Sequence, residues 1–391
     1  MYYYTFNRVF ISGVRPVFLM EDIHFMERAL ALAQNGIGCT SPNPAVGAVL
    51  VKDGVIIGEG YHQKAGEPHA EVHAIVQAKQ NNHDVRGAHL YVTLEPCCHM
   101  GRTPPCTDLL IQEGVARVVV GMRDSFQLVD GQGMVRLADA GVAVALLPET
   151  HPLIAPLRET NQAFIKWAQT GLPYVIMKTA VSLDGKIATR NGISKWITND
   201  AARDDARLER SRCDAVLIGG GTVVADDPEL STNDQYADKR LLRVVIDPTL
   251  SLPTTARVFR DEHVFIATTD RAKKRNHLRF LRQGISFESF GRKEVSFKRL
   301  LQYLGRHDIQ SVFIEGGGGV HGRFYDEARV DPLLLDRVVW YIAPTIIGGS
   351  GAFSAVAGQG VCELSETIPL KDVHTEMIGN NIKVTARANW Y

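Results

Sequence analysis

The stretch Ala88-His89-Leu90-Tyr91-Val92-Thr93-Leu94-Glu95-Pro96-Cys97 joins an apolar segment to a cysteine, and His69-Ala70-Glu71 precedes it. We expect Ala88 to Leu94 to be a strand that delivers Cys97 at its end. A helix is expected to begin near His69 and to run to about Lys79. Strands that alternate with helices, with such residues at the carboxyl end of a strand, indicate an α/β sheet that carries a site at its edge.

The same residues can hold a metal ion. The imidazole of His69 and the thiolates of Cys97 and Cys106 can bind zinc and leave its fourth tetrahedral position to water. The metal lowers the pKa of that water toward neutrality. Glu71 can take the proton from the water and pass it to a departing amine. His-x-Glu followed by Pro-Cys and a second Cys is the signature of zinc-dependent nucleobase deaminases.

The cysteine spacing departs from that signature. Two residues usually separate the cysteines, whereas the eight residues 98–105 intervene here. Gly101 and Pro104-Pro105 suit a folded loop between them. Cys98 is an alternative ligand; we prefer Cys97 because it directly follows Pro96, although sequence alone does not separate adjacent cysteines. The competing interpretation is that the cysteines are reduced and pack as small hydrophobic groups.

Length and composition limit the class of protein. A chain of 391 residues is too long for one typical core, so two domains are expected. Zero formal net charge argues against a nucleic-acid binder that relies on a basic surface. Six cysteines, half of them at 97, 98 and 106, do not resemble a disulfide framework, so we expect a reducing, cytoplasmic location. No apolar run reaches transmembrane length, and no membrane partner is expected.

We expect four segments along the chain. Residues 1–19 are an N-terminal extension to which we assign no chemistry; a targeting peptide and a start at Met20 are the alternatives. Residues 20–148 form the zinc domain. Residues 149–171, marked by prolines, form a connection. Residues 172–391 form a second α/β domain.

Glycine clusters follow two apolar strands of the second domain. Ala215 to Ile218 runs into Gly219-Gly220-Gly221, and Ser311 to Ile314 runs into Glu315-Gly316-Gly317-Gly318-Gly319. Glycines between a strand and a helix let backbone N–H groups approach a phosphate, which indicates a nucleotide cofactor. Neither cluster is a GxGxxG fingerprint, and plain tight turns are the competing interpretation.

Longer motifs in both halves resemble the bifunctional deaminase–reductase family of riboflavin biosynthesis. The deaminase half is similar at Pro42-Asn43-Pro44-x-Val46-Gly47, His69-Ala70-Glu71-Val72-His73-Ala74, Leu94-Glu95-Pro96-Cys97 and Gly101-Arg102-Thr103-Pro104-Pro105-Cys106. The reductase half is similar at Lys178-Thr179-Ala180-Val181-Ser182-Leu183-Asp184-Gly185-Lys186, Trp196-Ile197-Thr198, Ala225-Asp226-Asp227-Pro228, Glu315-Gly316-Gly317 and Ile342-Ala343-Pro344. The resemblance covers about residues 20 to 390. It implies a cytidine-deaminase-like α/β/α domain followed by a dihydrofolate-reductase-like α/β domain.

The resemblance also implies two reactions and their residues. The first domain would use zinc to deaminate 2,5-diamino-6-ribosylamino-4(3H)-pyrimidinone 5′-phosphate, and the second would use NADPH to reduce the ribosyl group to a ribityl chain. In the first domain Glu71 would be catalytic, His69, Cys97 and Cys106 would bind zinc, and Asn43 and Arg102 would bind substrate. Residues near NADPH would be Ala180, Trp196, Thr222, Asp226, Gly317, Gly318 and Gly319. Residues near the second substrate would be Lys178, Ser194, Arg210, Leu230 and Glu315.

Some of these residues have simpler interpretations. Asn43 suits a turn, Trp196 a core, and Asp226 a solvated turn. His73, one helical turn after His69, is slightly better explained as a structural histidine. The family implies a small-molecule substrate and a homo-oligomer, either a dimer or a tetramer.

The sequence departs from the family at three places. Asn233 and Ser251 stand where arginines are expected, and Asp124-Ser125-Phe126-Gln127 replaces Asp-Pro-Asn-Pro. Each lost guanidinium removes charge-assisted bonds worth roughly 1.5–3 kcal/mol, for which Arg210, Arg240 and Arg243 could compensate. The alternative is therefore an active deaminase joined to a reductase-like domain that is altered, inactive, or used for another substrate or for oligomerisation. A nucleic-acid deaminase is disfavoured by the neutral charge.

Overall fold

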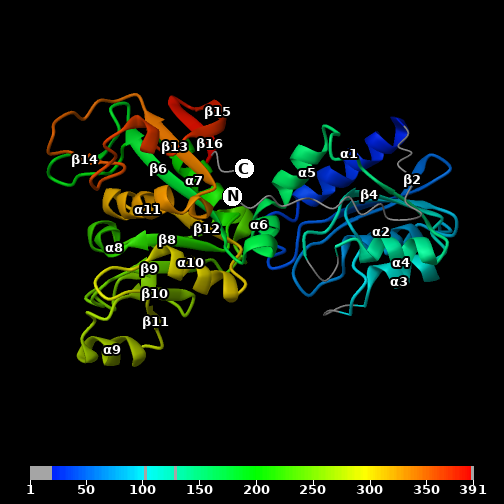
Figure 1. Cartoon of the computed structure of the whole chain (residues 1–391), viewed down its shortest axis with the longest axis horizontal. Coiled ribbons are helices and arrows are strands. Elements are labelled where there is room, and N and C mark those ends of the chain that lie inside the picture. Colours follow the sequence, from blue (N-terminus) through cyan, green and yellow to red (C-terminus); the bar gives the residue numbers. More distant parts are fainter. Residues whose placement is uncertain (1–19, 101–103, 127–129, 389–391) are drawn as a thin grey trace. The chain divides into compact units, whose positions relative to one another are not determined.

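The computed structural model describes residues 20–100, 104–126 and 130–388 (Figure 1). The expected N-terminal extension, residues 1–19, lies outside the described residues. The chain divides into two compact units between Thr170 and Gly171. Each unit has its own sheet. Within the described residues, no helix is both long and apolar enough to cross a membrane.

The sheet of the first unit has the strand order β2-β1-β3-β4-β5. Its strands are β1 (Gly47–Lys52), β2 (Val55–Tyr61), β3 (His89–Leu94), β4 (Arg117–Met122) and β5 (Ala143–Leu146). β1 is antiparallel to β2 and β3, whereas β3, β4 and β5 are parallel. Asp53 (φ 53°) and Gly54 (φ 76°) connect β1 to β2. Two successive residues with positive φ are typical of a tight hairpin.

Helices cover both faces of this sheet, which gives three layers (Figure 1). They are α1 (Met20–Gln34), α2 (Ala70–Gln80), α3 (Cys106–Gln112), α4 (Gln132–Asp139), α5 (Ile154–Thr160) and α6 (Gln162–Thr170). Alternate strand residues pack on opposite layers. Leu90 packs in a core with residues of α2, α3 and α4, and Tyr91 in a core with residues of α1. The predicted helix and strand agree with α2 and β3 within one residue.

Residues 149–171, expected to be a connection, contain α5 and α6, which lie in the first unit up to Thr170. The buried Asn161 between these helices accepts a hydrogen bond from the Ala45 N–H (2.8 Å) and donates one to the Ala45 carbonyl (2.9 Å). These bonds fasten the segment to the chain just ahead of β1.

Two glycines on β2 bring α2 close to the sheet. A Cβ on Gly58 would lie 2.1 Å from the carbonyl oxygen of Ala74, and one on Gly60 would lie 2.5 Å from that of Ala70. Only glycine leaves room for the helix backbone at these distances. The first turn of α2, with His69 ahead of it, is thereby held against the sheet edge.

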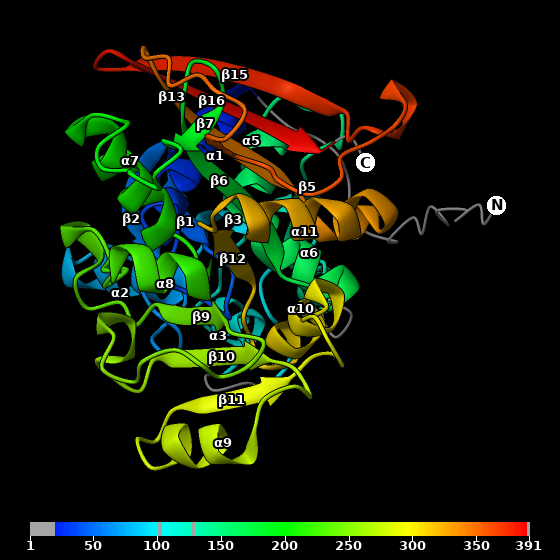
Figure 2. The same ribbon diagram turned by 90° about the vertical axis from the view of Figure 1, so that its left-hand side faces the viewer.

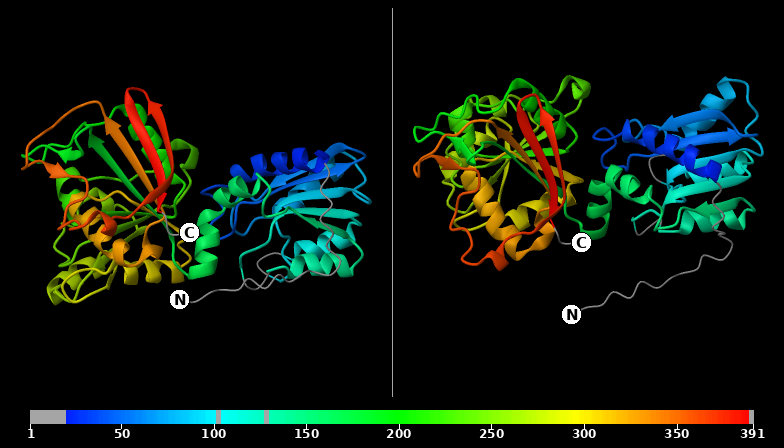
Figure 3. Two further views of the ribbon diagram at one scale, coloured as in Figure 1. Left: turned by 45° about the horizontal axis from the view of Figure 1, so that its top comes forward. Right: turned by 90° about the horizontal axis from the view of Figure 1, so that it is seen from above.

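The sheet of the second unit has the order β11-β10-β9-β8-β12-β6-β13-β16-β15 (Figure 2). The strands are β6 (Tyr174–Ser182), β8 (Ala215–Gly219), β9 (Leu242–Ile246), β10 (Val264–Thr268), β11 (Ser286–Ser289), β12 (Ser311–Ile314), β13 (Arg337–Ala343), β15 (Leu370–Ile378) and β16 (Asn381–Ala388), while β7 (Lys186–Ala188) pairs with β14 (Phe353–Ser354). β16 is antiparallel to β13 and β15. β15 and β16, drawn in red, form a long hairpin at one edge (Figure 3).

Helices pack on both faces of this sheet as well. They are α7 (Asp200–Ser211), α8 (Gly220–Asp226), α9 (Lys274–Leu281), α10 (Phe297–Arg306) and α11 (Gly318–Val330), with 3₁₀ turns at Asp234–Tyr236, Arg257–Phe259, Pro332–Leu334 and Leu364–Glu366. Leu304 of α10 and Phe324 of α11 contribute to one core, and Phe280 of α9 contributes to the other. Both units are therefore α/β, as expected, and both glycine clusters join a strand to a helix as predicted.

A buried ionic network holds α7 against β13 and β16. Lys383 is 6 % exposed, and its Nζ lies 2.7 Å from Asp205 Oδ2 and 3.1 Å from Glu209 Oε1. Burial by itself would raise the pKa of Glu209, but Arg337 and Lys383 lower it overall. Tyr341 donates a hydrogen bond to Asp205 Oδ2 (2.6 Å). Burying a charged side chain is costly unless a group of opposite charge lies close to it. The network therefore fixes the position of α7.

We expect Lys383→Met to destabilise the protein by roughly 1.5–3 kcal/mol, because the buried Glu209 loses one of its two cations and keeps only Arg337. Lys298→Met is the matched control: Lys298 pairs with Asp331 at 2.8 Å, but its side chain is 54 % exposed. Its loss should have little effect on the free energy of unfolding, because water screens an exposed ion pair. Urea unfolding of the full chain measures both, and equal effects would contradict the structural role of Lys383.

Candidate functional site

Three elements of the first unit bring His69, Cys97 and Cys106 together. His69 directly precedes α2, Cys97 follows β3 after Glu95-Pro96, and Cys106 is the first residue of α3. His69 Nδ1 lies 3.3 Å from Cys106 Sγ and 3.6 Å from Cys97 Sγ. Their ligand atoms all lie within 4.8 Å of one another. Around tetrahedral zinc the N···S separation is about 3.6 Å, so the three side chains fit that ion.

The two thiols of this cluster ionise unequally. Hydrogen bonds from the Cys106 thiol, His69 and the Cys106 N–H lower the pKa of Cys97. The pKa of Cys106, which is 1 % exposed, is raised by its bond to Cys97 and by burial. Two adjacent thiolates repel each other, and a bound cation removes that repulsion. The donor set thus suits a divalent metal.

Glu71 is 3 % exposed in the first turn of α2. Burial raises the pKa of its carboxyl group, against the influence of His69 and of a hydrogen bond with Cys106. A buried carboxyl group with a raised pKa beside a metal cluster is suited to accept and release a proton.

The structure distinguishes the two adjacent cysteines. Cys97, and not Cys98, contributes to the cluster of described residues that can hold a metal ion. The carbonyl oxygen of Cys98 instead accepts a hydrogen bond from Arg136 Nη1 of α4 (3.3 Å). Arg102, expected to bind substrate, lies outside the described residues.

Asn43 is oriented by a histidine that sequence reasoning missed. Its Nδ2 lies 3.0 Å from Nε2 of His62, and Nδ1 of His62 lies 3.1 Å from the Pro68 carbonyl oxygen. Burial lowers the pKa of His62, which is 2 % exposed and whose ring centroid is 5.2 Å from that of His69. A carbonyl only accepts, so Nδ1 of neutral His62 donates and Nε2 accepts from Asn43. His62 directly follows β2.

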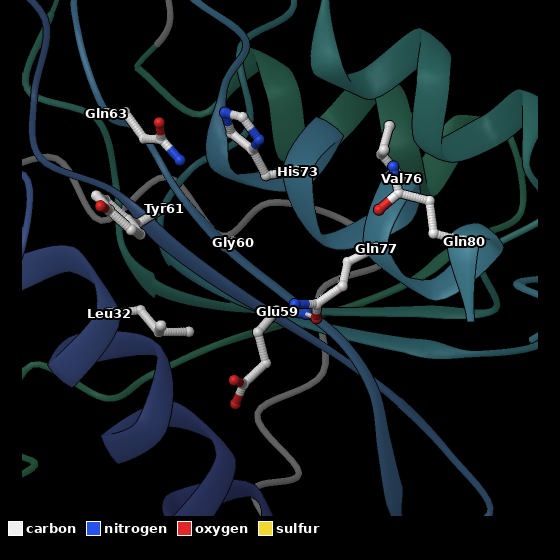
Figure 4. A pocket seen from close by; sticks show the side chains of 9 residues that line it. All are labelled: Leu32, Glu59, Gly60, Tyr61, Gln63, His73, Val76, Gln77 and Gln80. Carbon is white, nitrogen blue, oxygen red and sulfur yellow. Dashed lines mark hydrogen bonds between the residues drawn. The ribbon is translucent and has the colours of Figure 1, made fainter.

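His73 lies in α2 one turn after His69 but is not part of the metal cluster of described residues. It lines a separate pocket of about 390 Å³ (Figure 4). The other lining residues are Leu32, Glu59, Gly60, Tyr61, Gln63, Val76, Gln77 and Gln80. Glu59 in this pocket is paired with Arg28.

In the second unit, Lys178, Arg210 and Glu315 form a charged cluster. Glu315 follows β12 and lies beside β6, which carries Lys178. Its Oε2 lies 2.8 Å from Arg210 Nη1 and its Oε1 lies 3.4 Å from Lys178 Nζ. Burial by itself would raise the pKa of Glu315, but both cations lower it overall. Arg210 also donates to the Ser231 carbonyl, next to the buried Leu230.

Four of the expected cofactor residues, Thr222, Gly317, Gly318 and Gly319, lie at the starts of α8 and α11. Thr222 lies in the first turn of α8, and Gly317 directly precedes α11. A Cβ on Gly317 would lie 3.9 Å from Thr222 Oγ1, so these two segments are neighbours. Gly318 packs tightly on the Ser354 carbonyl, whereas a Cβ on Gly319 would meet open space. Backbone N–H groups at a helix start fit a phosphate.

The remaining expected residues come from other parts of the second unit. Ala180 shares a face of β6 with Lys178, since side chains alternate along a strand. Ser194 and Trp196 lie in the segment between β7 and α7; Trp196 is 70 % exposed, with the Arg203 guanidinium 4.2 Å from its ring centroid, and is therefore not a core aromatic. Asp226 ends α8, four residues after Thr222, on the same side of the helix.

The residues that replace the expected arginines serve local turns. Asn233 accepts a hydrogen bond from the N–H of Gln235, and Ser251 donates one to Asp247. Of the arginines that could compensate, Arg243 is paired with Asp261 and Arg240 with Glu262. Arg210 does reach the charged cluster, where it binds Glu315.

Comparison with known families defines the class of each unit. Residues 20–122 match the model of the cytidine and deoxycytidylate deaminase zinc-binding region, and residues 173–384 match the RibD C-terminal domain. The fold and the two sites are those of a deaminase joined to a reductase.

Relatives match both units in one chain. The riboflavin biosynthesis protein RibD of Bacillus amyloliquefaciens is 41 % identical over 371 residues, which cover 94 % of this chain and 96 % of the relative. That of Escherichia coli K12 is 38 % identical and covers 90 % and 94 %. The solved structure of Acinetobacter baumannii RibD (form 1) superposes with a TM-score of 0.83 at 35 % identity, covering 94 % of this chain and 99 % of that one. The chain belongs to the RibD family of riboflavin biosynthesis.

Family membership confirms the expected fold class and the two activities, with zinc and NADPH as cofactors. It does not favour the alternative of a reductase fold used for another purpose. The departures at Asn233 and Ser251 are therefore local substitutions within a bifunctional enzyme, whereas Gln127 of the third departure lies outside the described residues.

We expect Cys97→Ser to lower the zinc content of the purified protein well below stoichiometric, because serine is a poor zinc ligand. Cys98→Ser is the matched control and should leave the zinc content unchanged. Elemental analysis of both variants measures this. The reverse result would move the ligand by one residue.

Proposed function

We propose that His69, Cys97 and Cys106 hold the zinc of the deaminase unit and that Glu71 carries the proton of the reaction. The observation that supports this most is the convergence of three ligand atoms within 4.8 Å beside a buried carboxyl group. Bound there, zinc would supply Lewis acidity that lowers the pKa of water. The substrate would be 2,5-diamino-6-ribosylamino-4(3H)-pyrimidinone 5′-phosphate, which exchanges an exocyclic amine for oxygen and releases ammonia.

Several side chains of the first unit have separate roles in this deamination. Glu71 takes a proton from water and delivers it to the departing amine. His62 holds the amide of Asn43, which binds the pyrimidine ring or its sugar. Arg102 is assigned to the substrate by the family motif and binds its phosphate, for which a planar guanidinium is well suited.

In the second unit, Lys178, Arg210 and Glu315 bind the ribosyl group that is reduced. Lys178 Nζ lies 5.9 Å from the ring centroid of Tyr341 and is held by Glu315, so its position is set from two sides. NADPH, when bound, would supply the hydride, and Lys178 would donate a hydrogen bond to the sugar oxygen. Leu230 and Ser194 contact the same substrate.

The cofactor side uses the start of α11. Gly317, Gly318 and Gly319 place backbone N–H groups toward a phosphate of NADPH, with Thr222 beside them. Ala180, Trp196 and Asp226 line the remainder of the cofactor. The cytoplasmic location and the homo-oligomer, a dimer or a tetramer, stay predictions.

One coupled assay tests both halves of the proposal. Purified protein receives the diaminopyrimidinone ribosyl phosphate and NADPH, and ammonia release and NADPH absorbance are followed together. Equal amounts of both signals are expected. Ammonia without NADPH loss would contradict the reductase assignment, and the absence of ammonia would contradict the deaminase assignment.

We expect Glu71→Gln to keep its zinc and to lose deamination by roughly 10²- to 10⁴-fold, since the amide cannot transfer the proton. NADPH oxidation with the deaminated intermediate as substrate should be unchanged and controls for folding. Near-normal ammonia release would remove Glu71 from this role.

We expect Lys178→Met to slow NADPH oxidation by roughly 10- to 150-fold, the loss of one charge-assisted hydrogen bond. Ammonia release by the same variant should equal that of the wild type. Lys298→Met, a change of the same type at an exposed pair, is the control. A reductase rate equal to that control would exclude Lys178 from the reaction.

A further inference from the structure

Glu95 has an unusually complete set of hydrogen-bond donors. Glu95 is buried, with 3 % of its surface exposed. Oε2 accepts from the N–H groups of Asp124 (3.2 Å) and Gly131 (2.9 Å). Oε1 accepts from those of Gly133 (2.9 Å) and Met134 (3.2 Å). A carboxylate offers about four lone-pair positions, and four backbone donors fill them.

These donors come mainly from the start of α4, which has no side-chain cap of its own. Gly131, the residue that precedes the helix, has φ 90° and carries no side chain that could cap it. Glu95, from the end of β3, supplies that cap across 36 to 39 residues of sequence. The positive end of the helix dipole also favours a carboxylate there.

The same helix contacts the cysteine segment at two further points. A Cβ on Gly133 would lie 2.1 Å from the Pro96 carbonyl oxygen, so α4 rests directly on the residue before Cys97. Arg136 Nη1 donates to the Cys98 carbonyl (3.3 Å), and Arg136 Nη2 pairs with Asp108 of α3 (2.6 Å). Cys106 is the first residue of that helix.

We propose that Glu95 is a positioning residue, which fastens the Cys97 segment to α4 and thereby sets the geometry and the affinity of the metal site. This inference rests on the proposed role of His69, Cys97 and Cys106 as zinc ligands. Glu95 acts through Cys97 and touches neither the metal nor the substrate. Arg136 supports the same segment on the other side of Cys97, through its hydrogen bond to the Cys98 carbonyl oxygen.

The proposed role requires a carboxylate, and an amide of the same shape would not fulfil it. An amide of the same size has one carbonyl oxygen, and its NH₂ group would face two backbone N–H donors. Glu95→Gln therefore keeps the volume and breaks half of the contacts. Residues that orient metal ligands in this way typically change metal affinity or activity by 10- to 100-fold when they are replaced.

The test is the zinc affinity of full-length Glu95→Gln, measured by competition with a chromogenic chelator. We expect affinity roughly 10- to 100-fold below wild type. The visible absorption spectrum of the cobalt(II)-substituted protein should also change, because it reports the ligand geometry. NADPH oxidation with the deaminated intermediate should be unaffected. Glu149→Gln is the matched control, since Glu149 is 66 % exposed and pairs with Arg158 on the surface.

A purely structural role predicts a different result. If Glu95→Gln lowers the melting temperature but keeps the wild-type zinc affinity and cobalt spectrum, the proposal is wrong. Should that variant not fold, Arg136→Gln replaces it: Arg136 is 47 % exposed, and its loss should weaken zinc binding several-fold. Wild-type affinity and spectrum in Arg136→Gln would then overturn the proposal. Failure of the ligand assignment is recognised separately, by wild-type zinc content in Cys97→Ser.

Discussion

Both units contain a carboxylate removed from water at the end of a central strand, and that charge must be matched by donors close by. Glu95, after β3, is held by four backbone N–H groups. Glu315, after β12, is held by Lys178 and Arg210. An unmatched buried charge would cost far more than a folded domain can supply. The elements that provide the donors, α4 in one unit and α7 in the other, are thereby fixed next to the reacting residues.

Glu71 is buried as well, but its proposed use is different. Burial raises the pKa of both carboxyl groups above the usual value. The two residues differ in their partners: Glu95 accepts four backbone hydrogen bonds, whereas the hydrogen bonds that lower the pKa of Glu71 come from its own backbone and from Cys106. In the roles proposed above, Glu95 would hold the Cys97 segment and Glu71 would move protons.

The departures from the family pattern illustrate how a site tolerates substitution. Asn233 and Ser251 form hydrogen bonds within their own turns. The guanidinium at the charged cluster comes instead from Arg210, on a helix that is itself fixed by the pairing of Asp205 and Glu209 with Lys383. Site residues that come from α7 therefore depend on this network in the interior of the unit.

The sequence by itself determined the α/β class, the helix after His69, the strand before Cys97, the glycine turns after β8 and β12, and the set of residues that meet in the candidate metal cluster. These depend on hydrophobic periodicity and on motifs of a few residues, which local interactions specify. Only the tertiary structure decided between Cys97 and Cys98, paired His62 with Asn43, and placed α5 and α6 in the first unit. It also showed Glu95 as the cap of α4 and Lys383 as the centre of a buried network. Such contacts join residues tens to more than a hundred positions apart, and their geometry follows from how helices pack on the sheet, which no local pattern encodes.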